Sequence, residues 1–201
     1  MEGKRELKKE IVRQKIIESG LTCFLKFGFK NTTMNQIAKN SNVGVGTIYN
    51  YYESKEELLI ICFQKYILKE INQVIEMLDE RKIDLNQNMS DYMISCIDDI
   101  FKPVSIVPKE DMKIFIRGII GLESCAFNYS ELNKWIKLTE KTIIYNTFIG
   151  FNKKEELINL EELIDLIHNL IAINYQRYIS SEMTYNEFLL KLKSQFEFVF
   201  K

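Results

Sequence analysis

The sequence predicts an all-α protein, and three observations lead to that fold class. The 201 residues include only 2 Pro and 8 Gly, too few for the many tight turns of a β-sandwich or barrel. Hydrophobic residues make up 46% of the chain, which is enough to bury a core. Apolar residues recur at helical spacing between capping signals, and no segment shows the alternation of a secure strand.

The first predicted helix covers residues 7–27. Its apolar residues fall at steps of three, four or six, which places them on one face of a helix. They are Leu7, Ile11, Ile17, Leu21 and Phe24. Gly20, in the middle, is expected where another backbone packs closely. Gly28 is expected to stop the helix, because glycine adopts a positive φ at little cost.

Two short helices are predicted next. Thr33 and Gln36 are spaced as a capping box, which opens a helix with its apolar residues facing inward. This helix ends near Asn40–Asn42, because Asn tolerates the left-handed conformation of a sharp turn. Gly44 can then serve as the N-cap of a second short helix over residues 45–52.

The rest of the chain predicts longer helices. Ser54 and Glu57 are spaced as another capping box, which opens a helix reaching about residue 78. Pro103 and Pro108 predict a break between helices, beginning at 101. The further helices are expected over 90–101, 110–127, 130–150, 153–180 after an Asn152 cap, and 185–200 after the Thr184 capping box.

Charge and cysteine content narrow the function classes. Residues 1–52 hold nine basic and four acidic side chains, whereas the whole chain has a net charge of −1. A basic end fits an anionic partner such as nucleic acid or a membrane surface, or else a solvated helix face. The four Cys lack C-x-x-C spacing and His168 is the single His, so no metal site is expected. The sequence also lacks a Gly-rich phosphate loop, a Ser/His/Asp arrangement and a catalytic Cys context, so neither a cofactor nor a catalytic site is expected. Without a signal peptide or an apolar run that could span a bilayer, a cytoplasmic protein is expected.

Two short helices joined by a tight turn, after a basic helix, are the parts of a helix-turn-helix. In such a unit the second short helix lies in the DNA major groove and the first helix braces it. The small residues over Gly44–Thr47 would let the backbone of the second helix approach DNA closely.

The same stretch resembles the DNA-binding domain of the TetR family of bacterial transcription regulators. The matches at fixed spacing are Ile16-Ile17, Phe24, Gly28-Phe29, Thr32-Thr33, Ile37-Ala38, Val43, Gly46-Thr47-Ile48-Tyr49-Asn50-Tyr51-Tyr52 and Lys55-Glu56-Glu57-Leu58. They cover roughly the first quarter of the chain.

The resemblance implies DNA contacts for two groups of residues. Those that would hold phosphates, together with backbone N–H groups at helix starts, are Thr33, Thr47, Tyr49 and Lys55. Those that would face base edges are Val45, Asn50 and Tyr51. Asn50 could pair with adenine, whereas Val45 favours an apolar contact. Basic residues at the N-terminus, namely Lys4, Arg5, Lys8 and Lys9, would add electrostatic affinity.

No comparable motif follows the helix-turn-helix. We expect domains over 1–54 and 55–201, with the helix from 55 to 78 connecting them. The aromatic residues of the second domain suit either an apolar ligand cavity or simply a helical core. The candidates for ligand binding are Phe101, Phe115, Trp135, Tyr145, Phe148, His168 and Tyr175.

The last two predicted helices each carry an apolar stripe, and the resemblance implies that these helices form a dimer. The stripes fit a four-helix interface across a two-fold axis, or alternatively complete the core of one chain. The interface candidates are Leu163, Leu166, Leu170, Phe188, Leu192 and Phe196.

Together these features predict a homodimeric regulator, foremost a repressor, that binds palindromic double-stranded DNA and responds to a small apolar or aromatic inducer. One alternative has the same fold without an inducer, and its second domain docks a protein. Another is a helical enzyme or carrier with a vestigial N-terminal unit. A membrane-docked N-terminal helix is disfavoured, because such an anchor needs no turn and caps after it.

Overall fold

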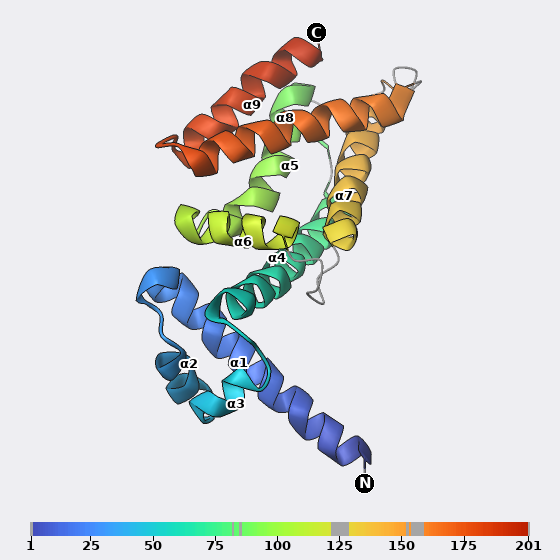
Figure 1. The fold of residues 1–201 in the computed structure, drawn as a ribbon. Coiled ribbons are helices and arrows are strands. Elements are labelled where there is room, and N and C mark those ends of the chain that lie inside the picture. Colours follow the sequence, from blue (N-terminus) through green and yellow to red (C-terminus); the bar gives the residue numbers. More distant parts are fainter. Residues whose placement is uncertain are drawn as a thin grey trace. The chain divides into compact units, whose positions relative to one another are not determined.

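The computed structural model describes residues 2–81, 83–84, 86–121, 129–151, 153 and 159–200. These residues form helices and connections without a strand among them, which confirms the all-α prediction (Figure 1). The helices are α1 (Glu2–Asn31), α2 (Met34–Ser41), α3 (Val45–Tyr49), α4 (Lys55–Glu80), α5 (Met89–Val104), α6 (Lys109–Gly121), α7 (Tyr129–Gly150), α8 (Leu160–Ser180) and α9 (Tyr185–Val199).

The chain divides into two compact units. Unit 1 contains α1, α2, α3, the part of α4 up to Leu68, and α6, whereas unit 2 contains the rest of α4 with α5, α7, α8 and α9. The membership of α6 is notable because its neighbours along the chain, α5 and α7, both belong to unit 2.

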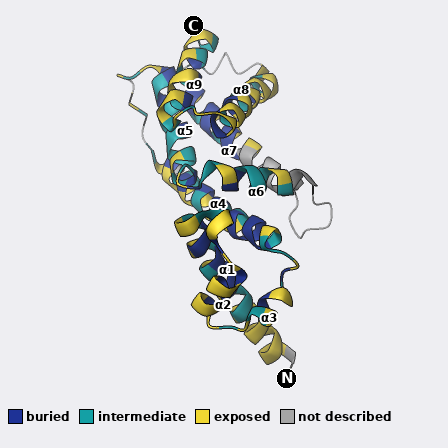
Figure 2. Cartoon of the chain, turned by 60° about the vertical axis from the view of Figure 1, so that its left-hand side comes forward, coloured by how far each residue is buried: buried dark blue, intermediate teal, exposed yellow. Residues whose placement is uncertain are grey.

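Unit 1 is built around aromatic rings from three helices. Phe24 of α1 stacks on Phe29 with 6.1 Å between ring centroids and meets Phe63 of α4 edge-on at 6.3 Å. Phe63 in turn meets Phe115 of α6 at 6.0 Å. Ile48 of α3 is fully buried within the same unit. Figure 2 shows that the buried residues of α1 gather in its middle, and that its N-terminal turns are exposed.

The local signals that predicted α2 and α3 are confirmed. The Thr33 hydroxyl accepts a hydrogen bond from the Gln36 N–H, and the Gln36 side chain accepts one from the Thr33 N–H, which completes the capping box. Asn42 ends α2 in the left-handed conformation, with φ of 54°. Gly28 has φ of 74° and kinks the end of α1, where a side chain would be strained.

Gly20 lies where α1 is packed tightly, although its neighbour is a side chain and not the backbone expected from the sequence. A Cβ at this position would lie 3.0 Å from Sγ of Cys62 on α4. The Cys62 thiol is buried and donates a hydrogen bond to the Ile17 carbonyl at 3.3 Å, so the sulfur is held in place. The missing side chain is therefore what allows α4 to contact α1 here.

Replacing Gly20 with Ala is expected to lower the free energy of unfolding by about 1–2 kcal/mol, because overpacking outweighs the gain in helix propensity. Urea unfolding followed by circular dichroism measures this change. Adding Cys62→Ala removes the sulfur, so the double variant should be more stable than the sum of the two single effects predicts. Simple additivity would contradict the contact.

Unit 2 contains a dense aromatic cluster where α5, α8 and α9 meet. Phe188 of α9 lies at its centre, with its ring centroid 5.6 Å from those of Phe101 and Tyr178 and 5.9 Å from those of Tyr175 and Tyr185. The Tyr185 hydroxyl donates to Oδ1 of Asp98 on α5 at 2.9 Å. These contacts fasten α9 to α5 through both apolar and polar groups.

The differences from the sequence predictions include two helix boundaries and one capping box. Helix α5 continues through Pro103 to Val104, where the break was expected to begin at 101. A proline in the last turn removes only one N–H donor, and Ser105 still donates to the Phe101 carbonyl at 2.8 Å. Helix α8 begins at Leu160, not at 153, and the expected Asn152 cap lies outside the described residues. In the Ser54 box only the hydroxyl acts as predicted, because the Glu57 carboxylate accepts from the N–H of Glu53.

Candidate nucleic-acid interface

Helix α3 presents one face to the core of unit 1 and the opposite face to solvent. Ile48 is fully buried, and the residues two positions to either side of it, Gly46 and Asn50, are exposed. This pattern follows from the 100° step of a helix, which places i±2 on the far side of residue i. Tyr49 is 52% exposed beside this outer face.

The outer face of α3 is shaped by small and polar groups. A Cβ at Gly46 would have no heavy atom within 4 Å, so this position faces open space. Val45 and Thr47 are half-buried at the start of the helix. Five of the seven residues predicted to bind DNA therefore lie on α3 or directly after it: Val45, Thr47, Tyr49, Asn50 and Tyr51.

Thr33 lies at the start of α2, where its side chain is exposed. Its hydroxyl accepts from the Gln36 N–H at 3.3 Å and donates to the Gln36 side-chain oxygen at 3.0 Å. The predicted capping role is thus present, and the first turn of α2 contains no acidic residue that would repel an anion.

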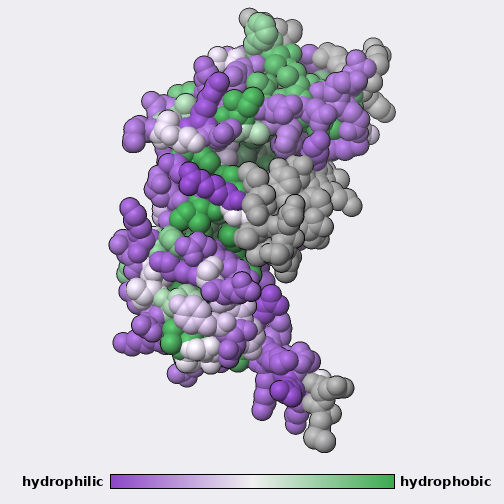
Figure 3. Space-filling model, in the orientation of Figure 1, coloured by the Kyte–Doolittle hydropathy of each residue, from purple (hydrophilic) through white to green (hydrophobic). Residues whose placement is uncertain are grey.

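The N-terminal turns of α1 form a hydrophilic extension of unit 1, and Figure 3 shows this surface. The Tyr51 hydroxyl donates to the backbone carbonyl of Lys9 at 3.4 Å, which links the end of the α3 region to α1. Residues before Lys9 continue as helix, so the basic residues predicted to add electrostatic affinity lie on the first turns of α1.

Lys55 is engaged within the protein. Its ammonium donates to the carbonyls of Phe29 and Thr32, both at 2.8 Å, and lies 4.1 Å from the centroid of the Phe29 ring. Two of its three N–H donors are therefore used to close the end of α1. Its predicted phosphate contact stays a prediction, with one donor remaining for it.

Sequence reasoning missed Asp111 of α6. Its carboxylate accepts a hydrogen bond from the Phe29 N–H at 2.7 Å, across 82 residues of sequence. The side chain is buried, and burial raises the pKa of this carboxyl, whereas the hydrogen bond from Phe29 and the nearby Lys55 ammonium lower it. No local spacing signals such a contact, because it depends on the packing of α6 against α1.

The residues predicted to bind a ligand, where their side chains are described, belong to different packing clusters. Phe101 and Tyr175 belong to the aromatic cluster of unit 2, whereas Phe115 packs in unit 1. Phe148 contacts the ring of Phe200, and Tyr145 is 42% exposed. The side chain of Trp135 lies outside the described residues.

His168 of α8 pairs with Glu140 of α7, with 2.8 Å between Nδ1 and the carboxylate. Glu140 is buried, which raises the pKa of its carboxyl, and His168 opposes that rise. The pair joins two helices of unit 2, so its observed role is in packing, and its predicted ligand contact remains a prediction.

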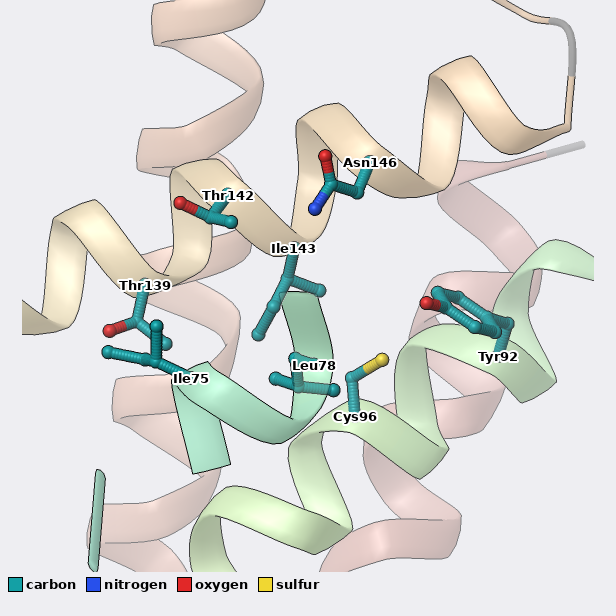
Figure 4. Close-up of a pocket in the computed structure, with 8 residues that line it drawn as sticks. All are labelled: Ile75, Leu78, Tyr92, Cys96, Thr139, Thr142, Ile143 and Asn146. Carbon is teal, nitrogen blue, oxygen red and sulfur yellow. The ribbon is translucent and has the colours of Figure 1, made fainter. Parts of the chain in front are cut away.

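A small cavity within unit 2 is lined by other residues, from α4, α5 and α7. Figure 4 shows these side chains: Ile75, Leu78, Tyr92, Cys96, Thr139, Thr142, Ile143 and Asn146. Its volume is about 10 Å³, which is room for about one water molecule. None of the six predicted ligand residues with described side chains lines it.

The predicted dimer residues separate into two groups. On α9, Phe188, Leu192 and Phe196 are fully buried within a single chain, because this stripe faces α5 and α8. On α8, Leu166 is 45% exposed, and Leu163 and Leu170 are half-buried. The apolar side chains that α9 leaves exposed are instead Leu190 and Phe198.

The described residues contain neither a metal-binding cluster nor a membrane-spanning helix. No group of three or more His, Cys, Asp or Glu side chains there could hold a metal ion. None of the described helices is long and apolar enough to cross a membrane.

Comparison with known proteins identifies the N-terminal part. Residues 16–61 match the family model described as bacterial regulatory proteins, tetR family. Over these residues the chain is similar to TetR-family regulators. The matched residues run from α1 into α4 and include the whole of α2, the turn and α3, so the resemblance found in the sequence is confirmed.

Two curated relatives each match part of the chain. The HTH-type transcriptional regulator YhgD of Bacillus subtilis is 39% identical over 74 residues, which cover 37% of this chain and 38% of the relative. The negative transcriptional regulator IcaR of Staphylococcus aureus, of the biofilm operon icaADBC, is 30% identical over 90 residues, covering 43% and 41%. The chain thus spans about two fifths of the length of the curated relatives it matches.

Solved structures resemble the fold along nearly the whole chain. A transcriptional regulator from Aquifex aeolicus VF5 aligns with a TM-score of 0.58 at 18% identity, covering 94% of this chain and 99% of that one. FadR from Bacillus subtilis, solved with stearoyl-CoA, aligns with a TM-score of 0.54 at 17% identity, covering 93% and 97%. At these identities the likeness concerns the fold alone.

Proposed function

We propose that this protein is a TetR-family transcription regulator that binds DNA and acts as a repressor. The observation that carries the proposal is the α2–turn–α3 unit, whose second helix buries Ile48 and turns Gly46 and Asn50 outward. A helix held in this way can enter a major groove. The repressor role is supported by IcaR, which is named as a negative regulator.

Residues on α3 and at helix starts would contact two different parts of the DNA, the phosphates and the base edges. Thr47 and Tyr49 hold phosphates, together with the N-terminal amides of α2 beside Thr33. Asn50, on the outer face of α3, pairs with an adenine edge, and Val45 contacts a thymine methyl. Basic residues of the N-terminal turns of α1 add salt-dependent affinity.

Palindromic DNA requires two copies of the helix-turn-helix, so we propose a homodimer. Leu166 of α8 is exposed with Ile173 one heptad further on, and the half-buried Leu163 and Leu170 flank it. Side chains at this spacing share one face of a helix and suit packing against a second copy across a two-fold axis. With its DNA partner in the cytoplasm, the dimer would act there.

Regulation by a small apolar molecule would involve unit 2. FadR, a neighbour in fold, is described with stearoyl-CoA, so acyl-CoA is a sensible first compound to test. The cavity of about 10 Å³ is far below the several hundred Å³ of ligand sites, so binding in this cavity would require the helices around it to separate. An inducer would act by binding the separated form more tightly than the DNA-bound form.

The test is selection of bound duplexes from random DNA, followed by titration of the selected duplex against salt. We expect a palindromic site whose affinity falls steeply as salt rises, since phosphate contacts release counterions. A scrambled duplex should bind at least about a thousandfold more weakly. The protein is also refolded from denaturant, which removes a bound inducer. If the refolded protein still selects no sequence, the regulator proposal is wrong.

A further inference from the structure

Helix α6 provides a contact to the start of the helix-turn-helix. It belongs to unit 1, where Phe115 packs against Phe63 of α4. Its first turn carries Asp111, which is 4% exposed and accepts from the Phe29 N–H at 2.7 Å. A buried carboxylate is costly unless it receives such hydrogen bonds, so this contact must be maintained in the folded protein.

The backbone of Phe29 is held at both of its polar groups. Its N–H donates to Asp111, and its carbonyl accepts from the Lys55 ammonium at 2.8 Å. Phe29 directly follows the kink at Gly28, where φ is 74°. At this kink the Phe29 N–H donates to a side chain, Asp111, and its carbonyl accepts from the Thr32 N–H at 3.3 Å as well as from Lys55.

The segment between Phe29 and α2 is held in place by hydrogen bonds. The Thr32 hydroxyl is buried and donates to the carbonyls of Gly28 at 2.8 Å and Cys23 at 3.1 Å. Thr33 then caps α2, and α2 packs against α3. A shift of the Phe29 backbone would therefore displace the start of α2 and, through it, the outer face of α3.

We propose that Asp111 is a positioning residue for DNA binding, whose carboxylate holds the Phe29 backbone and thereby fixes where the helix-turn-helix begins. This role rests on the function proposed above. Asp111 acts through Phe29 and touches no DNA. It belongs to a part of the chain, residues 109–121, that lies outside the family-model match at 16–61.

Loss of Asp111 would change DNA affinity in opposite directions through its direct electrostatic effect and through its positioning effect. Removing a negative charge from a DNA-binding unit should by itself strengthen DNA binding, because repulsion of phosphates falls. Releasing Phe29 lowers the fraction of molecules with a correctly placed α2, and the apparent affinity falls by that fraction. We expect Asp111→Ala to weaken operator affinity about tenfold.

Three variants of the full chain are compared on the selected duplex. Asp111→Ala removes the acceptor, and Asp111→Asn keeps an accepting oxygen and the volume. Glu110→Gln is the matched control, because Glu110 is exposed on the same turn and pairs with Lys113 at 2.5 Å. Affinity is measured well below the melting temperature across a salt series. A merely structural residue would not change affinity there, since almost all molecules are folded.

The proposal predicts that Asp111→Ala binds the operator more weakly than the wild type, and that the affinity of Asp111→Asn lies within about threefold of the wild-type value. Glu110→Gln should bind the operator with unchanged or slightly higher affinity. The slope of affinity against salt should be the same for all three variants. Unchanged or tighter binding by Asp111→Ala would overturn the proposal. If that variant does not fold, Asp111→Leu, which also lacks an acceptor, replaces it. If the wild type selects no DNA, the proposed function fails first and the positioning role fails with it.

Discussion

Replacing Gly46 with Glu is expected to abolish operator binding, with a loss of at least about a hundredfold in affinity. Gly46 lies on the outer face of α3, opposite the buried Ile48, and a side chain there meets no atom of the protein within 4 Å. The new carboxylate would enter the groove beside the phosphates, where like charges repel by several kcal/mol. In a dimer the repulsion acts at both half-sites.

The matched control is Gly46→Ala, which adds a Cβ in the same open space without a charge. We expect it to bind within about tenfold of the wild type and to unfold with a free energy up to about 1 kcal/mol higher, because Ala favours helix over Gly. Fluorescence anisotropy with the selected duplex measures the affinity of both variants, and circular dichroism checks that they fold. Wild-type affinity in Gly46→Glu would mean that α3 does not enter the groove.

The helix-turn-helix was predictable because its signals are local. The Thr33 capping box and the left-handed turn at Asn42 depend on residues three or four positions apart, and their types alone specify the geometry. Burial within α3 follows in the same way from the 100° step around Ile48. The residues that carry the family resemblance are the same ones, so the resemblance reinforced these local signals.

Long-range contacts were not predictable from the sequence. Lys55 fits the family pattern for a phosphate contact, yet its ammonium donates hydrogen bonds to carbonyls 23 and 26 residues away in the sequence. Asp111 meets a backbone N–H 82 residues away, and no spacing rule links the two. Both contacts depend on how helices pack against α1, which a single chain's periodicity does not determine.

Helical periodicity also leaves open what an apolar stripe faces. Phe188, Leu192 and Phe196 repeat every four residues, which identifies one face of α9 but not its partner. In the structure this face of α9 packs inside the core of unit 2, whereas Leu190 and Phe198 are exposed. The alternative in which the stripe completes the core of one chain is the one that the structure shows for α9.

Replacing Phe188 with Ala should therefore destabilise each chain, whether or not two chains associate. The ring is fully buried and lies within 6 Å of four other aromatic rings, measured between centroids. Losing a buried Phe of this kind lowers the free energy of unfolding by about 3–5 kcal/mol, a large part of the 5–15 kcal/mol that typically holds a domain together. Urea unfolding followed by far-UV circular dichroism measures the change.

The control for Phe188 is Leu190→Ala, two positions further along α9, where the side chain is 65% exposed. Its truncation should change the stability of an isolated chain by less than about 0.5 kcal/mol. Both variants are unfolded at two protein concentrations, because the midpoint of a dimer depends on concentration whereas that of a monomer does not. Phe188→Ala should lose stability to the same extent at both. If its loss appeared only where the wild type is dimeric, Phe188 would be an interface residue after all and the packing of α9 in unit 2 would need revision.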